Sequence, residues 1–270
     1  MSDGFTTFIT ESRKVLSEDS WLKHMRQHCA NSHTAAKTSG LFTTIKSDND
    51  FLLVEPKNLD RKTMFMVDDL IEKLASWKHT PHRRKALIGY TSLSSARQYA
   101  GKEEKLYIML PYDRGSLCMV NAESFYSGCE KACKALHITS ISNGQLRSWV
   151  SSLRRVAKAI GITTAKNEPM TANEFLVAVN ELEGLKDAKK IEDLQKLDDD
   201  DLERAVAFAS RSGTPEEFLS NMFDPDVNRV EKFLAIHHNM PADREIWTET
   251  PCLLISLSAY KRLYEAGKIK

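Results

Sequence analysis

Residues His82–Pro111, HRRKALIGYTSLSSARQYAGKEEKLYIMLP, predict a strand, a polar turn, a short helix and a second strand. Ala86–Ile88 is a short apolar run that ends in small and hydroxylated residues, as strands often do. Apolar residues at helical spacing predict a helix over Leu93–Ala100, and a glycine ends it. Leu106–Leu110 alternates like a half-buried strand. The turn Tyr90-Thr91-Ser92 therefore places three side chains that can hydrogen-bond a ligand at a strand end.

The composition is that of a soluble globular protein. Its 270 residues can form one elaborated domain or two, and 41% of them are hydrophobic and 28% charged. No apolar run approaches the roughly 20 residues that a membrane helix needs, so we expect no membrane partner. The five cysteines are an odd number without the spacing of a disulfide framework, which indicates a reduced, cytosolic setting.

The charged residues are distributed unevenly. Residues 1–165 contain 24 Lys and Arg against 16 Asp and Glu, and residues 166–270 contain 14 against 21. The basic part favours an anionic ligand such as a dinucleotide or a nucleic acid, unless the acidic part simply neutralises it. The cluster Arg83–Lys85 and the basic side chains of a helix expected over Gln145–Ile160 are the candidate nucleic-acid contacts.

The central stretch resembles the core of the ADP-ribosyltransferase superfamily. In that family a Ser-Thr-Ser turn at a strand end is followed by a helix with an Ala and a Tyr-Gly pair, and then by a strand that ends in Pro. The matching positions here are Tyr90-Thr91-Ser92, Ala96, Tyr99, Gly101 and Pro111. The resemblance implies an α+β fold with a split β-sheet core and a large helical insertion, and NAD as cofactor. The residues alone also fit a strand–helix–strand unit whose hydroxyls cap the helix.

The same resemblance assigns catalytic roles. A late strand in the family delivers a catalytic Glu, and Glu245-Ile246-Trp247 matches that placement, with Glu249 as a second candidate. Glu245 would stabilise the oxocarbenium ion that forms when the bond between nicotinamide and ribose breaks, and Thr91 and Ser92 would orient it. Tyr90 would stack on the nicotinamide. An edge strand with its charges turned to water is the alternative for the Glu245 segment.

One family position departs from the pattern. The first core strand of the family carries an Arg that holds the NAD phosphates, and Thr43 stands there in this chain. A threonine has no charge, so phosphate binding would pass to another cation, with Arg83 and Arg84 as candidates. Loss of such a clamp weakens binding by about 2–5 kcal/mol. The alternative is that Arg83 and Arg84 belong to a solvated loop.

The N-terminus carries a second resemblance. Phe8-Ile9-Thr10-Glu11-Ser12-Arg13 is similar to the capsid-targeting leaders of internal head proteins of tailed phages. The likeness implies cleavage after Glu11, packaging of the protein in the virion, and a location in the virion interior and the host cytoplasm. The alternative is an ordinary amphipathic helix within Met1–Lys14.

The remaining segments are expected to be mostly helical. Helices are predicted over Ser20–His33 and Arg61–Trp77, and an acidic helical region over Thr171–Met240, with a capping box at Thr171. His24 and His28 share a helical face, but no further ligands follow at metal-site spacing, so we expect no metal. We predict four parts: a leader and helix (1–37), the first part of the core (38–140), a helical insertion (141–240), and the closing strands with a terminal helix (241–270).

Three functions are compatible with these patterns. The first is a phage-encoded, virion-packaged ADP-ribosyltransferase-like protein that acts on a host protein, with its catalytic competence in question because the Arg and first Ser of the signature are replaced. The second is a non-catalytic protein on the same fold that binds a host factor or stays inside the phage head. The third is a nucleic-acid-binding protein.

Overall fold

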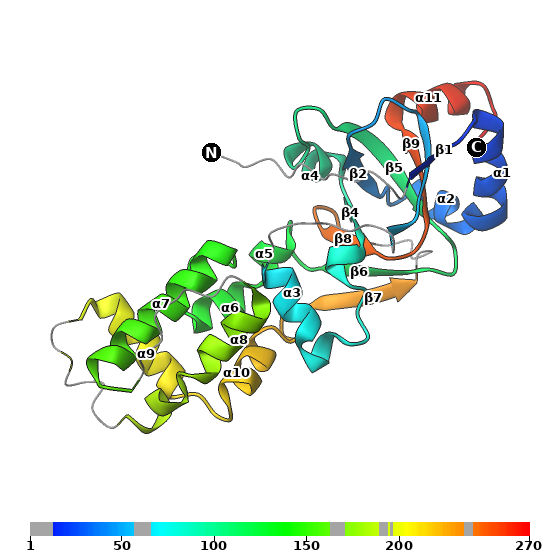
Figure 1. Cartoon of the computed structure of the whole chain (residues 1–270). Helices are drawn as coiled ribbons and strands as arrows, with labels where there is room; N and C mark the ends of the chain where they lie inside the picture. Colours follow the sequence, from blue (N-terminus) through cyan, green and yellow to red (C-terminus); the bar gives the residue numbers. More distant parts are fainter. Residues whose placement is uncertain (1–12, 57–65, 163–170, 189–193, 195–196, 235–239) are drawn as a thin grey trace. The chain divides into compact units, whose positions relative to one another are not determined.

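The computed structural model describes residues 13–56, 66–162, 171–188, 194, 197–234 and 240–270. It confirms an α+β protein with a large antiparallel sheet (Figure 1). The chain divides into two compact units. The sheet unit comprises Met1–Thr63, Thr80–Phe125 and Val230–Lys270, and the helical unit comprises Met64–His79 and Tyr126–Arg229. The described residues include no helix that is both long enough and apolar enough to cross a bilayer.

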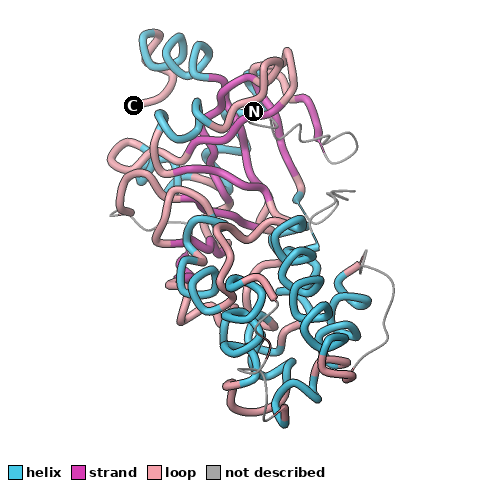
Figure 2. The backbone as a smooth tube through the Cα atoms, turned by 90° about the vertical axis from the view of Figure 1, so that its left-hand side faces the viewer, coloured by secondary structure: helices cyan, strands magenta, loops and turns pink. Residues whose placement is uncertain are grey.

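The sheet unit contains nine described strands in the order β1-β3-β9-β5-β2-β4-β8-β6-β7, and every neighbouring pair is antiparallel. Figure 2 shows these strands side by side. Their bounds are β1 Arg13–Val15, β2 Phe42–Ile45, β3 Phe51–Val54, β4 Leu87–Tyr90, β5 Lys105–Pro111, β6 Ser116–Val120, β7 Val230–Leu234, β8 Glu245–Thr248 and β9 Cys252–Ser256.

Both faces of the central strands are buried, because alternate residues enter two different core clusters. In β3, Leu52 and Val54 belong to one cluster, and Phe51 and Leu53 belong to the other. Three helices cover the face that carries Phe51: α1 (Glu18–His28), α2 (Ala30–Ala36) and α11 (Leu257–Glu265). This double burial explains why these strands are almost continuously apolar in sequence.

One row of paired residues crosses six strands of the sheet on this helix-covered face. Its members, from β3 to β8, are Phe51, Ile255, Ile108, Phe42, Tyr90 and Glu245. Residues that pair directly across antiparallel strands point to the same side, so Tyr90 and Glu245 share a face. Two residues predicted to form a site are thus neighbours, although more than 150 positions separate them.

The stretch around Tyr90 forms the elements that its pattern predicts. A 3-10 turn, η3 (Arg83–Lys85), leads into β4, and α4 (Leu93–Gln98) follows the hydroxylated turn and leads to β5. Ser92 is the N-cap of α4, where its hydroxyl accepts a hydrogen bond from the Ser95 amide. The helix ends two residues earlier than expected, at a C-cap on Tyr99.

The helical unit packs around a cluster of aromatic residues. Trp149 contacts Phe175 and Phe208, and the ring of Phe208 meets Phe218 edge to face. The predicted capping box at Thr171 is confirmed. Helix α5 (Phe125–Gly128) begins at Phe125, the last residue of the sheet-unit segment Thr80–Phe125, and continues into the helical unit. The other elements of the helical unit are α3 Met66–Lys73, η2 Ala75–Trp77, α6 Glu130–Ala135, α7 Asn143–Ala159, α8 Ala172–Asn180, η4 Glu183–Asp187, α9 Asp199–Ala209 and α10 Pro215–Met222.

Two expectations about helices are wrong. The helix predicted over Ser20–His33 is interrupted at Cys29, because the carboxylate of Asp113 accepts the amides of Asn31 and Ser32 and starts a new helix there. The helical region predicted as far as Met240 contains β7, an edge strand that pairs with β6. The start of the helix predicted from Arg61, and the leader residues up to Ser12, lie outside the described residues.

Candidate functional site

The candidate site lies where β4 ends and β8 begins, and we call it the strand-end site. The two strands pair from Leu87 with Thr248 to Tyr90 with Glu245. The pairing continues past the end of β4, because the Thr91 amide donates to the carbonyl of Arg244 at 2.9 Å. Antiparallel pairing therefore brings the hydroxylated turn next to the acidic strand.

Glu245 forms a buried ion pair with Arg83. Its Oε1 accepts hydrogen bonds from Nη2 of Arg83 at 2.8 Å and from Nε at 3.1 Å, and the side chains are each 3% exposed. Its Oε2 accepts the backbone amide of Phe125 at 3.1 Å. The Arg83 guanidinium also lies 5.0 Å from the centroid of the Phe125 ring. Both oxygens of the predicted catalytic acid thus have protein donors, and the predicted phosphate ligand is its main partner.

Two residues of β8 and Glu249, which follows the strand, hold the segment before β4. Besides the Glu245 pair, the indole Nε1 of Trp247 donates to the carbonyl of Pro81 at 3.0 Å. Oε1 of Glu249 accepts the amide of His82 at 3.1 Å. Glu245 and Trp247 point to one side of β8, and together with Glu249 they bond to residues 81–83.

The hydroxyls of the turn bond to nearby protein groups. Oγ1 of Thr91 donates to the carbonyl of Pro241 at 2.7 Å and accepts the amide of Arg244 at 2.9 Å. Ser92 caps α4 and donates to Oδ1 of Asp243. Thr91 is buried, whereas Ser92 is partly exposed. These bonds tie the turn to the loop that precedes β8.

Asp243 is a member of the strand-end site that the sequence analysis missed. Its Oδ1 accepts hydroxyl hydrogen bonds from Ser92, from Ser95 at 3.1 Å and from Ser94 at 3.4 Å. These donors, led by Ser92, lower the pKa of the carboxyl from its ordinary value. Its backbone has a φ of 56°, in the left-handed region, which Asp tolerates better than most residues. The only sequence signal is an Asp in a Pro-Ala-Asp turn just before a strand.

The predicted cofactor ligands do not all gather at this site. Thr43 pairs with Tyr107, which belongs to the core cluster on the opposite face of the sheet from Glu245. Its Oγ1 donates to the carbonyl of Ile88 at 2.6 Å, and the residue is 2% exposed. Tyr90 stacks on Tyr99, with ring centroids 5.0 Å apart and planes 5° apart. Arg84 lies beside Arg83 in η3 and is half-buried.

No family model, curated protein or solved structure matches this chain. Within the described part of the chain, no three His, Cys, Asp or Glu side chains gather as a metal site would require. The strand-end site contains a carboxylate–guanidinium pair below the surface, and an Asp with three serine hydroxyls closer to solvent.

Proposed function

We propose that this chain is a phage-encoded, virion-packaged protein with an ADP-ribosyltransferase-like fold that acts on a host protein by binding it, without transferring ADP-ribose. The proposal combines the two sequence resemblances with the geometry of the strand-end site. Its locations would be the virion interior before infection and the host cytoplasm afterwards.

The buried pair of Arg83 and Glu245 is the observation that carries this proposal. A catalytic carboxylate must approach the ribose of NAD, yet both oxygens of Glu245 accept hydrogen bonds from the protein and its side chain is 3% exposed. Removing one partner from a buried ion pair costs about 3–5 kcal/mol, because the other charge is left uncompensated. The pair therefore favours a structural role for Glu245 over a catalytic one.

The other signature positions support the same proposal. Thr43 replaces the phosphate-binding Arg of the family and points into the core on the other face of the sheet. Thr91 bonds to backbone groups, and Ser92 caps a helix. Each of these side chains has a sufficient structural reason for its identity, without a ligand.

A second candidate function is an active, NAD-dependent mono-ADP-ribosyltransferase. The register favours it, since Tyr90 and Glu245 face the same side at the strand end that carries the hydroxylated turn. For this activity, Arg83 would have to leave Glu245 and bind the NAD pyrophosphate, which would free the carboxylate to stabilise the oxocarbenium ion.

Nucleic-acid binding is the least favoured function. Arg83 is buried against Glu245, and on α7 Arg154 and Arg155 pair with Glu181 and Asp201. Guanidinium groups that are already paired contribute little to phosphate binding. Nucleic-acid binding also predicts an affinity that falls steeply with salt, which a titration at several salt concentrations measures.

Label transfer from NAD separates the two leading functions. The protein is incubated with labelled NAD and host extract, and in parallel it is immobilised to capture host proteins. We expect no labelled host protein, and a captured partner whose binding survives Ser92→Ala. Label transfer that Glu245→Gln abolishes, in a variant that stays folded, would establish the transferase instead and overturn the binding proposal.

A stability measurement tests the structural role of the pair directly. We expect Glu245→Gln to lower the free energy of unfolding by about 3–5 kcal/mol in urea titrations. Glu103→Gln is the matched control, because Glu103 pairs with Lys46 with both side chains well exposed, and exposed pairs of this kind contribute little to stability. Equal stability of the two variants would remove the main support for the proposal.

A further inference from the structure

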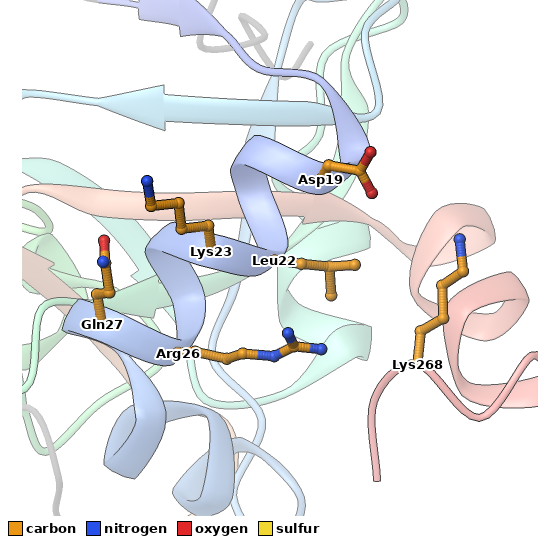
Figure 3. A pocket seen from close by; sticks show the side chains of 6 residues that line it. All are labelled: Asp19, Leu22, Lys23, Arg26, Gln27 and Lys268. Atoms are coloured by element: carbon orange, nitrogen blue, oxygen red, sulfur yellow. The ribbon is translucent and has the colours of Figure 1, made fainter.

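The sheet unit has an open groove between α1 and the C-terminal segment, far in sequence from the strand-end site (Figure 3). It encloses ≈ 570 Å³ and is lined by Asp19, Leu22, Lys23, Arg26, Gln27 and Lys268. The first five of these residues fall at i, i+3, i+4, i+7 and i+8, so they form one face of α1 over about two turns. Leu22 is the buried member of this set, and the others are exposed.

The groove carries cations that the described protein does not neutralise. Lys23 and Arg26 form no ion pair with any residue in the described ranges. Lys268 on the opposite wall pairs with Glu18, which also lies 3.6 Å from Arg262. Figure 3 shows Arg26 and Leu22 extending toward the segment that carries Lys268. The groove therefore combines two unpaired positive charges with a small apolar base.

We propose that this groove binds an acidic segment of a partner protein. The planar guanidinium of Arg26 can donate two parallel hydrogen bonds to one carboxylate. Lys23 provides a second positive charge one helical turn away. The side chain of Leu22 and the aliphatic stems of the basic residues supply apolar contact between the charges.

The lining favours a peptide over a small phosphorylated molecule. Sites for small molecules bury about 70–90% of the ligand surface, but five of the six lining residues here are exposed, so the groove is open. An open groove that follows a helix face instead suits an elongated segment, which makes its remaining contacts outside the groove.

The lining also favours a peptide over a nucleic acid. No aromatic side chain lines the groove, so bases have no surface on which to stack. Asp19 at one end repels an unbroken line of phosphates, whereas a peptide can place a neutral or basic residue opposite it. The inference shares no residue with the pair of Arg83 and Glu245, so it stands or falls independently of the function proposed above.

Fluorescence anisotropy with a short labelled peptide of alternating Glu and Ala tests the groove. We expect binding that weakens with added salt, no binding of the matching Gln–Ala peptide, and about a tenfold loss of affinity in Lys23→Glu/Arg26→Glu. The control is Lys131→Glu/Lys134→Glu, which makes the same change of charge at exposed positions of α6 outside the groove and should bind like the parent.

Three outcomes would overturn the proposal. The first is the absence of peptide binding at low salt. The second is an equal loss in the α6 control, which would mean that total charge and not the groove decides the affinity. The third is tighter binding of an oligothymidylate of similar length that Lys23→Glu/Arg26→Glu abolishes, which would identify a nucleic-acid site. Circular dichroism checks that each variant is folded.

Discussion

At the scale of single residues, the strand-end site shows how burial decides the role of a charged group. A carboxylate loses several kcal/mol of hydration when it is buried, and it remains charged only if donors replace the lost water. Glu245 has three such donors, two from Arg83 and one from the Phe125 amide. Asp243, closer to solvent, has serine hydroxyls instead. The two acids are therefore held by different chemistry, although they are two positions apart.

The Asp243 cluster predicts a specific pH dependence of stability. Its pKa is lower in the folded protein than in the unfolded chain, so the ionised carboxylate contributes stability that is fully present above the unfolded value of about 3.9. That contribution disappears as the pH falls through the folded value. We expect Asp243→Asn to melt below the parent at pH 7, and we expect this difference to close as the pH falls through the lowered pKa of the folded carboxyl. Thermal melts across this range measure the difference, and a gap of constant size would contradict the assigned cause.

The sequence predicted the members of the strand-end site better than their contacts. Tyr90, Thr91, Ser92 and Glu245 do adjoin, because a hydroxylated strand end and a late acidic strand are local patterns that sheet pairing can join. The partnership of Arg83 with Glu245 could not be predicted, since it depends on a register between positions 162 residues apart. Thr43 was correctly predicted to lie on a strand. Adjacent residues of a strand point to opposite faces of the sheet, and the register of strand pairing decides which face Thr43 occupies.

At the scale of elements, close packing at Gly89 holds the centre of the sheet together. A Cβ at this position would lie 2.7 Å from the backbone oxygen of Phe42 and 3.3 Å from Cε of Met109. The first contact is with backbone in the adjacent strand β2, which cannot move without disturbing the ladder. A glycine therefore lets β2 and β4 approach here.

Gly89→Ala is expected to lower the free energy of unfolding by about 1–3 kcal/mol, as other overpacked core substitutions do. The matched control is Gly144→Ala in the first turn of α7, where a Cβ would meet only Oγ of Ser142, at 3.9 Å. That change should be neutral or should stabilise by up to about 1 kcal/mol, because alanine loses less entropy on folding. Urea titrations compare the two, and equal effects would contradict the packing argument.

The strands were easier to predict than the breaks between helices. The apolar alternation over Leu106–Leu110 predicted β5 to within one residue at each end. The break between α1 and α2 arises from Asp113, which is distant in sequence and caps α2 through its carboxylate. The strand β7 was missed because its sequence, Val-Glu-Lys-Phe-Leu, is short, lacks a period-2 alternation and follows a long helical region.

At the scale of the whole molecule, the segments that form the two compact units alternate along the sequence. The helical unit takes residues 64–79 as well as 126–229, whereas composition placed the insertion at 141–240. The segment 64–79 precedes β4 in sequence. Its local pattern does not indicate to which of the two units it belongs. Its amphipathic helix was predicted, but its membership depends on which apolar faces meet.

The five cysteines give a measurable signature of the folded chain. All five are free, four are buried, and Cys133 is partly exposed. Burial raises the pKa of Cys29 and of Cys118 to about 12, so very little reactive thiolate exists at pH 8. We expect a thiol reagent to modify Cys133 alone in the native protein, and all five cysteines in guanidinium. Cys133→Ala should abolish the native reaction, and rapid labelling of any other cysteine would contradict the buried positions.

The order of strands in the sheet has a consequence for how the protein is made. Among the described strands, β8 and β9 are the last two in sequence, and both lie inside the sheet, where β8 separates β4 from β6 and β9 separates β3 from β5. Until residue 256 has emerged, the earlier strands expose unpaired apolar edges of the kind that chaperones recognise and that promote aggregation. Folding of the sheet must therefore wait until β9 has been synthesised, and slow synthesis would prolong the vulnerable period.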